Sequence, residues 1–288
     1  MQSGGRSVTY FNGSWMDGRT PIMTANTHGA WLGSMVFDGG RIYRRLGPDI
    51  DLHCARAVES ARTIGLAPTI DGPAIERLAW QGADQFSDDA ELYVRPMFWA
   101  EDGPLGPDAA TTRFALYLEE AKLPAGTGFT ACLARRRRPS PETMPTDAKA
   151  SGLYAQVGLI HLEAKRRGFD GAVVLDPNGN VAEFMAANLF MAKDGIVSTP
   201  VHNRCFLNGL TRQRTIALLR ADGFEVRERT IAFEELMEAD ELFSTGNYAK
   251  IRYCTKLEDR ALPHGPVAQR AWSLYQDFAA RSFRPRAA

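Results

Sequence analysis

The sequence lacks the features that mark secreted, membrane-spanning or strongly charged proteins. Its longest apolar runs are far shorter than the roughly 20 residues that cross a bilayer. The N-terminal stretch MQSGGRSVTY has no secretory hydrophobic segment. Lysine plus arginine and aspartate plus glutamate both total 34, so the formal net charge is zero. We therefore expect neither a nucleic-acid partner nor a membrane partner attracted by overall charge.

Cysteine and histidine are too few and too scattered to predict a metal centre. The cysteines are Cys54, Cys132, Cys205 and Cys254, with no CxxC pair among them. The five histidines form no HxxxH motif and no cluster with the cysteines. We expect no metal, reduced thiols and a cytoplasmic location.

Length and composition predict an ordinary globular chain. Its 288 residues are 44% hydrophobic and 24% charged, too long for one small core and suited to one large or two medium domains. The stretch KLPAGTG, residues 122–128, has the composition of a linker. It predicts a smaller N-terminal domain over 1–121 and a larger C-terminal domain over 129–288 that contains Lys149.

Strand and helix patterns occur in segregated groups. Hairpin turns are expected at Asn12-Gly13, within GAVVLDPNGNVAEF and at Asp194-Gly195. Helices are expected over 51–65, 73–86, 153–168 and 266–283, with another that has Thr211 as its N-cap. This mixture predicts an α/β chain of the α+β kind, rather than a doubly wound sheet.

Lys149 lies in MPTDAKASGLY, residues 144–154, among alanine, serine and glycine. On this stretch alone, a surface lysine in a loop is the simpler interpretation. Small neighbours also leave room for a flat, bulky group beside an amine partly withdrawn from water. Such an amine acts as a nucleophile or forms a Schiff base.

Two charged residues have an equally ambiguous setting. Glu183 follows a hairpin in VAEFMAAN, where a buried carboxylate needs a cationic or N–H partner, although strand-end glutamates commonly face water. Arg56 lies in the apolar stretch HCARAVESA and either points at a fixed anion or extends its head to solvent. The run from Arg135 to Arg138 is most simply a solvated, charged stretch.

Two loops have the composition of anion sites. LNGLTR places Gly209 before a helix, whose free N–H groups and dipole suit a phosphate, although an ordinary capped helix fits equally well. STGNYAK adds Gly246 and Asn247 after a strand, a weaker signal of the same kind. An amine, a partnered carboxylate and an anion site together match pyridoxal 5'-phosphate.

Several long motifs in order resemble the class IV, or fold-type IV, pyridoxal-phosphate aminotransferases, most closely the branched-chain amino acid aminotransferases. The resemblance covers nearly the whole chain. It is carried by VFDGGR, His53 to Arg56, YVRP, PTDAKASGLY, EAKRRGFDGAVVLDPNGNVAE, NGLTR and ADELFSTGNYAK. It implies a two-domain fold with the cofactor in the interdomain cleft, and a homodimer.

The resemblance also implies a role for each cofactor residue. Lys149 matches the lysine that holds the cofactor and shuttles a proton, Tyr154 the tyrosine at its phenolic oxygen, and Glu183 the glutamate at its ring nitrogen. The phosphate residues of the family match Arg56, Leu210, Thr211, Gly246 and Asn247.

On the substrate side, the resemblance implies a pocket for an apolar side chain and for the second carboxylate of 2-oxoglutarate. The matching residues are Trp31, Phe37, Arg41, Tyr93, Arg95 and Tyr248. Either Arg95 or Arg41 is the expected partner of that second carboxylate. The implied reaction is ping-pong transamination from branched-chain or other apolar L-amino acids to 2-oxoglutarate.

Some residues depart from the family pattern. Phe184 and Met185 follow the glutamate where a glycine-containing run is usual, and we expect them to narrow the space beside the cofactor. Asn247 stands where threonine is common, and Trp31 where tyrosine is common.

The altered pocket residues leave room for a same-fold transaminase of D-amino acids or amines. A second alternative is a lyase of the same superfamily, such as one for aminodeoxychorismate. An inactive, binding-only relative would be expected if Lys149 or Glu183 were replaced, and both are present.

Overall fold

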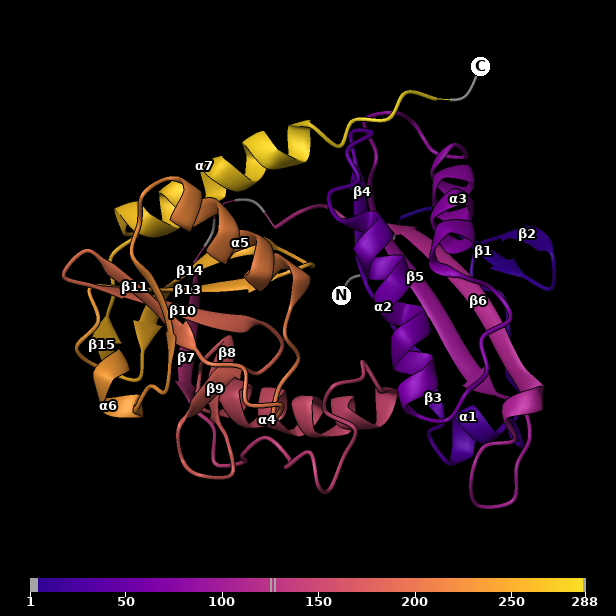
Figure 1. Cartoon of the computed structure of the whole chain (residues 1–288), viewed down its shortest axis with the longest axis horizontal. Helices are drawn as coiled ribbons and strands as arrows, with labels where there is room; N and C mark the ends of the chain where they lie inside the picture. The colour runs from indigo at the N-terminus through magenta and orange to yellow at the C-terminus, as the bar shows by residue number, and fades with distance from the viewer. Residues whose placement is uncertain (1–4, 125, 127, 287–288) are drawn as a thin grey trace. The chain divides into compact units, whose positions relative to one another are not determined.

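The computed structural model describes residues 5–124, 126 and 128–286, which fall into two units (Figure 1). Unit 1 comprises Met1–Leu123, Ala148–Gly152 and Phe278–Ala288, and unit 2 comprises Pro124–Asp147 and Leu153–Asp277. The segment with Lys149 therefore belongs to unit 1, although its position in the sequence lies within the predicted C-terminal domain. Of the predicted linker, Ala125 and Thr127 lie outside the described residues, and the predicted domain bounds stay a prediction.

Unit 1 is built on a sheet in which every strand pair is antiparallel. The strands are β1 (Ser7–Phe11), β2 (Ser14–Asp17), β3 (Met35–Phe37), β4 (Gly40–Tyr43), β5 (Glu91–Ala100) and β6 (Thr112–Glu120). Their order is β2-β1-β6-β5-β3, and β4 also pairs with β5. The predicted first hairpin is confirmed, because Asn12 and Gly13 join β1 to β2 with φ of 50° and 83°.

Two helices, α2 (Ile50–Thr63) and α3 (Gly72–Ala83), cover one face of this sheet (Figure 1). The alternation of β5 explains the packing, because Val94 and Phe98 are fully buried on one face while Arg95 on the other is only partly buried. Both helices lie within a few residues of their predicted bounds. The short elements of unit 1 are α1 (His28–Trp31) and the 3₁₀ turn η1 (Ala109–Thr111).

Unit 2 contains a larger sheet with both parallel and antiparallel pairs. Its strands are β7 (Phe129–Leu133), β8 (Gly171–Leu175), β9 (Val181–Phe184), β10 (Asn188–Lys193), β11 (Ile196–Pro200), β12 (Val226–Arg229), β13 (Glu241–Gly246), β14 (Lys250–Leu257) and β15 (Arg260–Ala261). The order is β12-β11-β10-β13-β14-β7-β8-β9, with β15 on β14. The hairpins expected at PNGN and Asp194-Gly195 join β8 to β9 and β10 to β11, as predicted.

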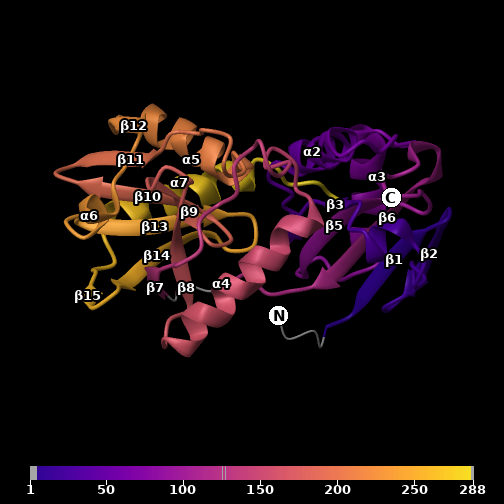
Figure 2. The same ribbon diagram turned by 90° about the horizontal axis from the view of Figure 1, so that it is seen from below.

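Helices lie on both sides of this sheet, with α5 (Leu210–Ala221) and α7 (Pro266–Ala280) on one side and α4 (Tyr154–Arg166) on the other (Figure 2). The short elements are η2 (Ser151–Leu153) and α6 (Phe233–Leu236). The prediction of Thr211 as an N-cap is wrong, because α5 begins at Leu210 with Gly209 as its N-cap. Thr211 lies inside the first turn, where its side chain is buried. Two sheets with segregated helices confirm the predicted α+β class.

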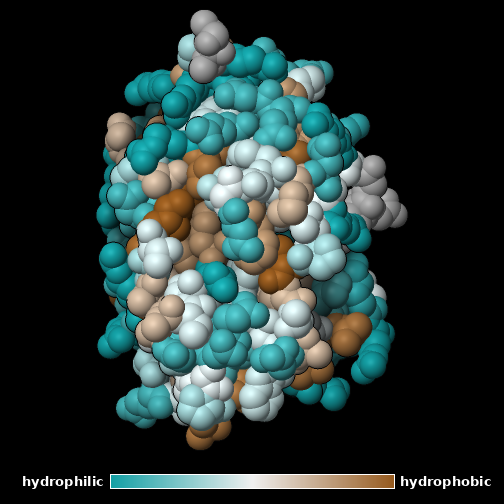
Figure 3. Space-filling view, turned by 90° about the vertical axis from the view of Figure 1, so that its right-hand side faces the viewer, coloured by the Kyte–Doolittle hydropathy of each residue, from teal (hydrophilic) through white to brown (hydrophobic). Residues whose placement is uncertain are grey.

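The surface combines polar residues with limited apolar areas. On the face shown in Figure 3, a small patch of hydrophobic residues is surrounded by polar ones. The large hydrophobic side chains that unit 1 exposes include Trp31, Leu32 and Leu105. Every helix in the described part of the chain falls short of the length and apolar character that a membrane crossing requires. Within the same residues, histidine, cysteine and acidic side chains form no group of three that could hold a metal ion.

Candidate active site

The backbone around Lys149 is fixed by hydrogen bonds within unit 1. Its carbonyl oxygen accepts from Phe37 N at 3.1 Å, and its own N–H donates to Ser60 Oγ at 3.1 Å. Ala150 forms a bridge with Val36 of β3, and both alanines beside the lysine are buried. The Nζ atom lies 5.0 Å from the centre of the Phe37 ring. The small neighbours therefore let this segment pack closely against β3 and α2, while the lysine side chain is only partly buried.

Arg56 points at a fixed anion, and that anion is the carboxylate of Asp38. Arg56 Nε and Nη2 donate to the two oxygens of Asp38 at 2.6 and 2.9 Å. His53 Nδ1 lies 2.7 Å from Asp38 Oδ1, and the backbone N–H of Gly39 donates to the same oxygen at 2.7 Å. Burial opposes ionisation of Asp38, but the charges and hydrogen bonds of Arg56 and His53 outweigh it and hold its pKa well below the usual range. Arg56 is thereby locked in one orientation.

Asp38 is a site residue that the sequence reasoning missed. It lies in VFDGGR, a motif that carried the resemblance, but no role was predicted for it. An acidic residue between an apolar strand and two glycines was the available signal. Because its side chain is fully buried, its ionised state requires the partners that it has.

The predicted substrate residues Arg41, Tyr93 and Arg95 form one cluster in unit 1. Arg41 and Tyr93 are direct partners in the β4–β5 register, and the Arg41 and Arg95 guanidinium carbons lie 5.7 and 5.2 Å from the centre of the Tyr93 ring. Arg41 is fully buried and donates to the carbonyl of Ala121. A Cβ on Gly39 would lie 2.1 Å from the Tyr93 hydroxyl, so glycine is required at that position.

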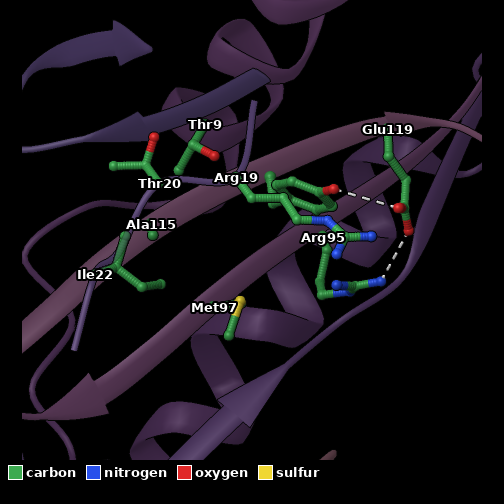
Figure 4. A pocket seen from close by; sticks show the side chains of 9 residues that line it. Thr9, Arg19, Thr20, Ile22, Arg95, Met97, Ala115 and Glu119 are labelled. Atoms are coloured by element: carbon green, nitrogen blue, oxygen red, sulfur yellow. Dashed lines mark hydrogen bonds and ion pairs between the residues drawn. The ribbon is translucent and has the colours of Figure 1, made fainter. Parts of the chain in front are cut away.

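Arg95 lines a pocket of about 390 Å³ in unit 1 (Figure 4). Its lining side chains come from β1, β5, β6 and the segment after β2: Thr9, Arg19, Thr20, Ile22, Arg95, Met97, Ala115, Tyr117 and Glu119. Arg95 Nη2 binds Glu119 at 3.2 Å, and the Tyr117 hydroxyl donates to the other oxygen of Glu119 at 3.3 Å. With Arg19 added, the pocket holds two guanidinium groups and one carboxylate. Its net charge is therefore suited to an anionic ligand group.

Glu183 in unit 2 has the partners that a buried carboxylate needs. Arg138 Nη2 forms an ion pair with Glu183 Oε1 at 2.8 Å, and Asn188 Nδ2 donates to Oε2 at 3.1 Å. The predicted solvated run is thus wrong for Arg138, whose side chain is mostly buried, and right for Arg135 to Arg137, which are exposed. Arg138 also donates to the carbonyl of Met185 at 2.7 Å, which fixes the guanidinium beside β9.

Phe184 and Met185 pack into hydrophobic clusters of unit 2. Because successive residues of β9 point to opposite faces, Phe184 points away from Glu183 and packs against Phe129, with ring centres 5.0 Å apart. Met185 packs against the cluster that contains Cys132. The expectation that these residues narrow the space beside the cofactor is therefore wrong for Phe184, and it stays a prediction for Met185.

Asn188 links Glu183 to the first of the two predicted phosphate loops. Its Oδ1 accepts from Gly209 N at 3.2 Å, and its Nδ2 donates to the carbonyl of Leu207 at 3.0 Å as well as to Glu183. A Cβ on Gly209 would lie 2.2 Å from Asn188 Oδ1, so this contact requires glycine. No side chain caps α5, so its first N–H groups, including those of Leu210 and Thr211, can donate to a bound acceptor.

The second predicted phosphate loop lies at the same end of α5. Asn188 is the cross-strand partner of Thr245, which directly precedes Gly246 and Asn247, and α5 packs on β13. Thr245 Oγ1 and Asn247 Nδ2 are buried without a hydrogen-bond partner among the described residues. Buried donors without partners are rare in proteins. Together with the uncapped helix, they fit a bound phosphate.

The remaining predicted residues are largely accessible to solvent. Tyr154 begins α4 and is 37% exposed, Tyr248 is 42% exposed, and Trp31 in α1 is 59% exposed. Hydrogen bonds and cross-strand pairing thus connect Glu183 with both phosphate loops in unit 2, and Arg56 with Asp38 in unit 1.

The cysteines provide no competing nucleophile. All four are buried free thiols. Burial raises the pKa of Cys254 to about 12, and burial raises the pKa of Cys54 still further. Because the thiolate is the reactive form, neither sulfur attacks a carbonyl at neutral pH.

The sequence is similar to those of known aminotransferases. A sequence model of the family "Amino-transferase class IV" matches residues 35–257. The branched-chain-amino-acid aminotransferase of Salmonella typhimurium is 32% identical over 263 residues, covering 84% of this chain and 82% of that protein.

Solved structures give the same result. An aminotransferase from Brucella abortus bound to the cofactor PLP superimposes with a TM-score of 0.94 at 45% identity, covering 96% of this chain and 99% of that one. The branched-chain aminotransferase of Thermoproteus uzoniensis with norvaline gives 0.88 at 26% identity, covering 96% of each chain. These likenesses confirm the predicted fold-type IV architecture.

Proposed function

The chain belongs to the class IV aminotransferase family, and we propose that it is a pyridoxal-phosphate-dependent transaminase acting on branched-chain or other apolar L-amino acids, with 2-oxoglutarate as acceptor. The observation that carries the proposal is the buried carboxylate of Glu183, held by Arg138 at 2.8 Å and by Asn188 at 3.1 Å. A carboxylate fixed in this way is suited to pair with a protonated ring nitrogen.

Each half of the cofactor has matching residues in the chain. Lys149 would hold it covalently, Tyr154 would contact its phenolic oxygen, and Glu183 its ring nitrogen. Its phosphate would be bound by Arg56, Leu210, Thr211, Gly246 and Asn247. When bound, the cofactor supplies an electron sink for the pair released from the substrate Cα.

The chain's own residues perform the remaining tasks. Lys149 Nζ would take the proton from the substrate Cα as a general base and deliver it, in the same half-reaction, to the C4' atom of the cofactor as a general acid. In the second half-reaction the same transfer would run in reverse. Arg138 and Asn188 each bind one oxygen of Glu183 and so hold its carboxylate in one orientation. Asp38 keeps Arg56 in a fixed orientation, so that little conformational entropy is lost when an anion binds.

The distal carboxylate of the acceptor is assigned to Arg95 rather than to Arg41. Arg95 lines the pocket of unit 1 together with Arg19, whereas Arg41 is fully buried beside Ala121. Replacing Arg95 by methionine is expected to raise KM for 2-oxoglutarate about tenfold or more, the loss of one charge-assisted pair. KM for an apolar amino donor should change much less, and equal changes for both substrates would contradict the assignment.

Two finer statements complete the proposal. We infer a homodimer, supported by the exposed Trp31 and Leu32 of unit 1 and by the homodimer that the family resemblance implies. We infer a cytoplasmic location, supported by four free thiols and no disulfide between them. Light scattering of the purified protein tests the dimer.

The absorption spectrum of the purified protein tests the function directly. A visible band should disappear on addition of L-leucine and return on addition of 2-oxoglutarate. A panel of L-amino acids, D-amino acids and primary amines separates the same-fold transaminases from one another. Turnover without any 2-oxo acid would identify a lyase, and a protein that neither binds the cofactor nor turns over would contradict the proposal.

A further inference from the structure

Lys250 is a buried lysine beside the second predicted phosphate loop. Lys250 is only 1% exposed and is the first residue of β14. It pairs with Gly246 across the β13–β14 hairpin and has a φ of 60°, which is rare for a residue with a side chain. The turn between β13 and β14 thus brings Lys250 next to Asn247, which lies three positions earlier in the sequence.

The ammonium of Lys250 determines the orientation of the Asn247 amide. Lys250 Nζ donates to Asn247 Oδ1 at 2.5 Å. An ammonium has donors only, so it can face the oxygen of the amide and never its nitrogen. The Nδ2 group of Asn247 is consequently directed away from Lys250, buried and without a hydrogen-bond partner among the described residues.

A second donor lies in the same loop. Thr245 is fully buried, and its hydroxyl also lacks a hydrogen-bond partner within the described part of the chain. Through its cross-strand partner Asn188, Thr245 is adjacent to Gly209 and the uncapped start of α5. Two oriented donors, a helix N-terminus and a buried cation therefore meet at one place in unit 2, which suits a dianion.

We propose that Lys250 is a positioning residue for the phosphate of the cofactor. It holds Asn247 so that Nδ2 donates to a phosphate oxygen, and its charge complements the dianion. This explains how asparagine serves at a position where a hydroxyl is common: the amide is a good phosphate donor only when its oxygen is turned away. The inference rests on the proposed function, and it concerns a residue that the resemblance did not assign.

The test compares two ligands that differ only in the phosphate. Apoprotein is titrated with pyridoxal 5'-phosphate and with pyridoxal, for the wild type and for Lys250→Met. The dissociation constant of pyridoxal 5'-phosphate should rise between tenfold and a hundredfold, which corresponds to about 1.4 to 2.8 kcal/mol. The dissociation constant of pyridoxal should change less than about twofold, because the lost interaction involves the phosphate alone.

Lys256→Met is the matched control, because Lys256 lies on the same strand and has no part in the loop. It should leave both constants unchanged. Equal weakening of both ligands by Lys250→Met, or no weakening of either, overturns the inference. If Lys250→Met does not fold, Asn247→Ala is measured in its place. It should also weaken the binding of pyridoxal 5'-phosphate and leave that of pyridoxal nearly unchanged, and equal weakening or no weakening would again overturn the inference. A wild type that binds neither ligand would instead contradict the proposed function.

Discussion

Among the residues described, each unit has a buried carboxylate bound by an arginine, Asp38 in unit 1 and Glu183 in unit 2, and the two differ in where their hydrogen bonds lead. Asp38 in unit 1 binds Arg56 and His53, which lie on α2, and accepts from the N–H of Gly39 in its own motif, VFDGGR. Glu183 in unit 2 receives Arg138 on one oxygen and Asn188 on the other, and Asn188 continues to the start of α5. The comparison teaches that similar ion pairs serve different purposes. We assign Asp38 to holding an arginine in place and Glu183 to contacting the cofactor.

Removing the carboxylate of Asp38 should produce the largest change. Asp38→Ala removes the anion that binds the buried His53 and the partly buried Arg56, and the free energy of unfolding should fall by about 3 to 5 kcal/mol. Urea unfolding of the apoprotein measures this loss. Asp17→Ala is the control, because the Asp17 side chain is 82% exposed in its pair with Arg6, and it should cost less than about 1 kcal/mol. Equal losses in the two variants would show that Asp38 is not a structural anchor.

Isosteric amides at the two positions should separate the roles most clearly. Glu183→Gln removes the charge that would face the ring nitrogen, and kcat at saturating cofactor should fall by about 10²- to 10³-fold, as for loss of one preoriented electrostatic partner. Asp38→Asn should lower cofactor affinity while kcat at saturation falls less than about tenfold. Steady-state kinetics with excess cofactor measures both variants. The assignment fails if the two kcat values decrease alike.

Lowering the pH should reduce the free energy of unfolding partly through protonation of Asp38. This is the smallest of the expected effects. Partners in the folded state hold its pKa below the unfolded value of about 3.9, so the stabilisation is complete above that value and is lost as pH falls below it. The slope that Asp38 adds is at most about 1.4 kcal/mol per pH unit. Unfolding free energies measured between pH 5 and about pH 2.5 should decline less steeply for Asp38→Asn than for the wild type. Parallel curves would contradict the assigned pKa shift.

Local sequence signals predicted those parts of the structure that depend on neighbouring residues. Asn12-Gly13 predicts a hairpin because both residues accept positive φ, and the structure has that turn. Gly209 was recognised as the residue before a helix, but the cap was assigned to Thr211. The N–H of Gly209, the N-cap residue of α5, donates to Asn188, 21 residues earlier, and a local pattern contains no such contact.

Partners that are distant in sequence could not be predicted from the pattern. Arg138 lies in a run of four arginines, and only the fold shows that it pairs with Glu183, 45 positions later. Asp38 and Arg56 are similarly joined because β3 and α2 pack together. Phe184 is a different case. The motif predicts that its large side chain narrows the space beside the cofactor, but strand alternation directs this side chain into the core. Local chemistry identified the residue types, and packing determined their partners.

The central claim is that Lys149 is the residue that holds the cofactor. Borohydride reduction of the loaded protein, followed by protease digestion and mass spectrometry of the peptides, tests it most directly. If Lys149 holds the cofactor, the cofactor mass will be found on the peptide that contains Lys149, and Lys149→Ala will give no labelled peptide. Label on another lysine, or an unmodified Lys149 in protein that turns over normally, would contradict it.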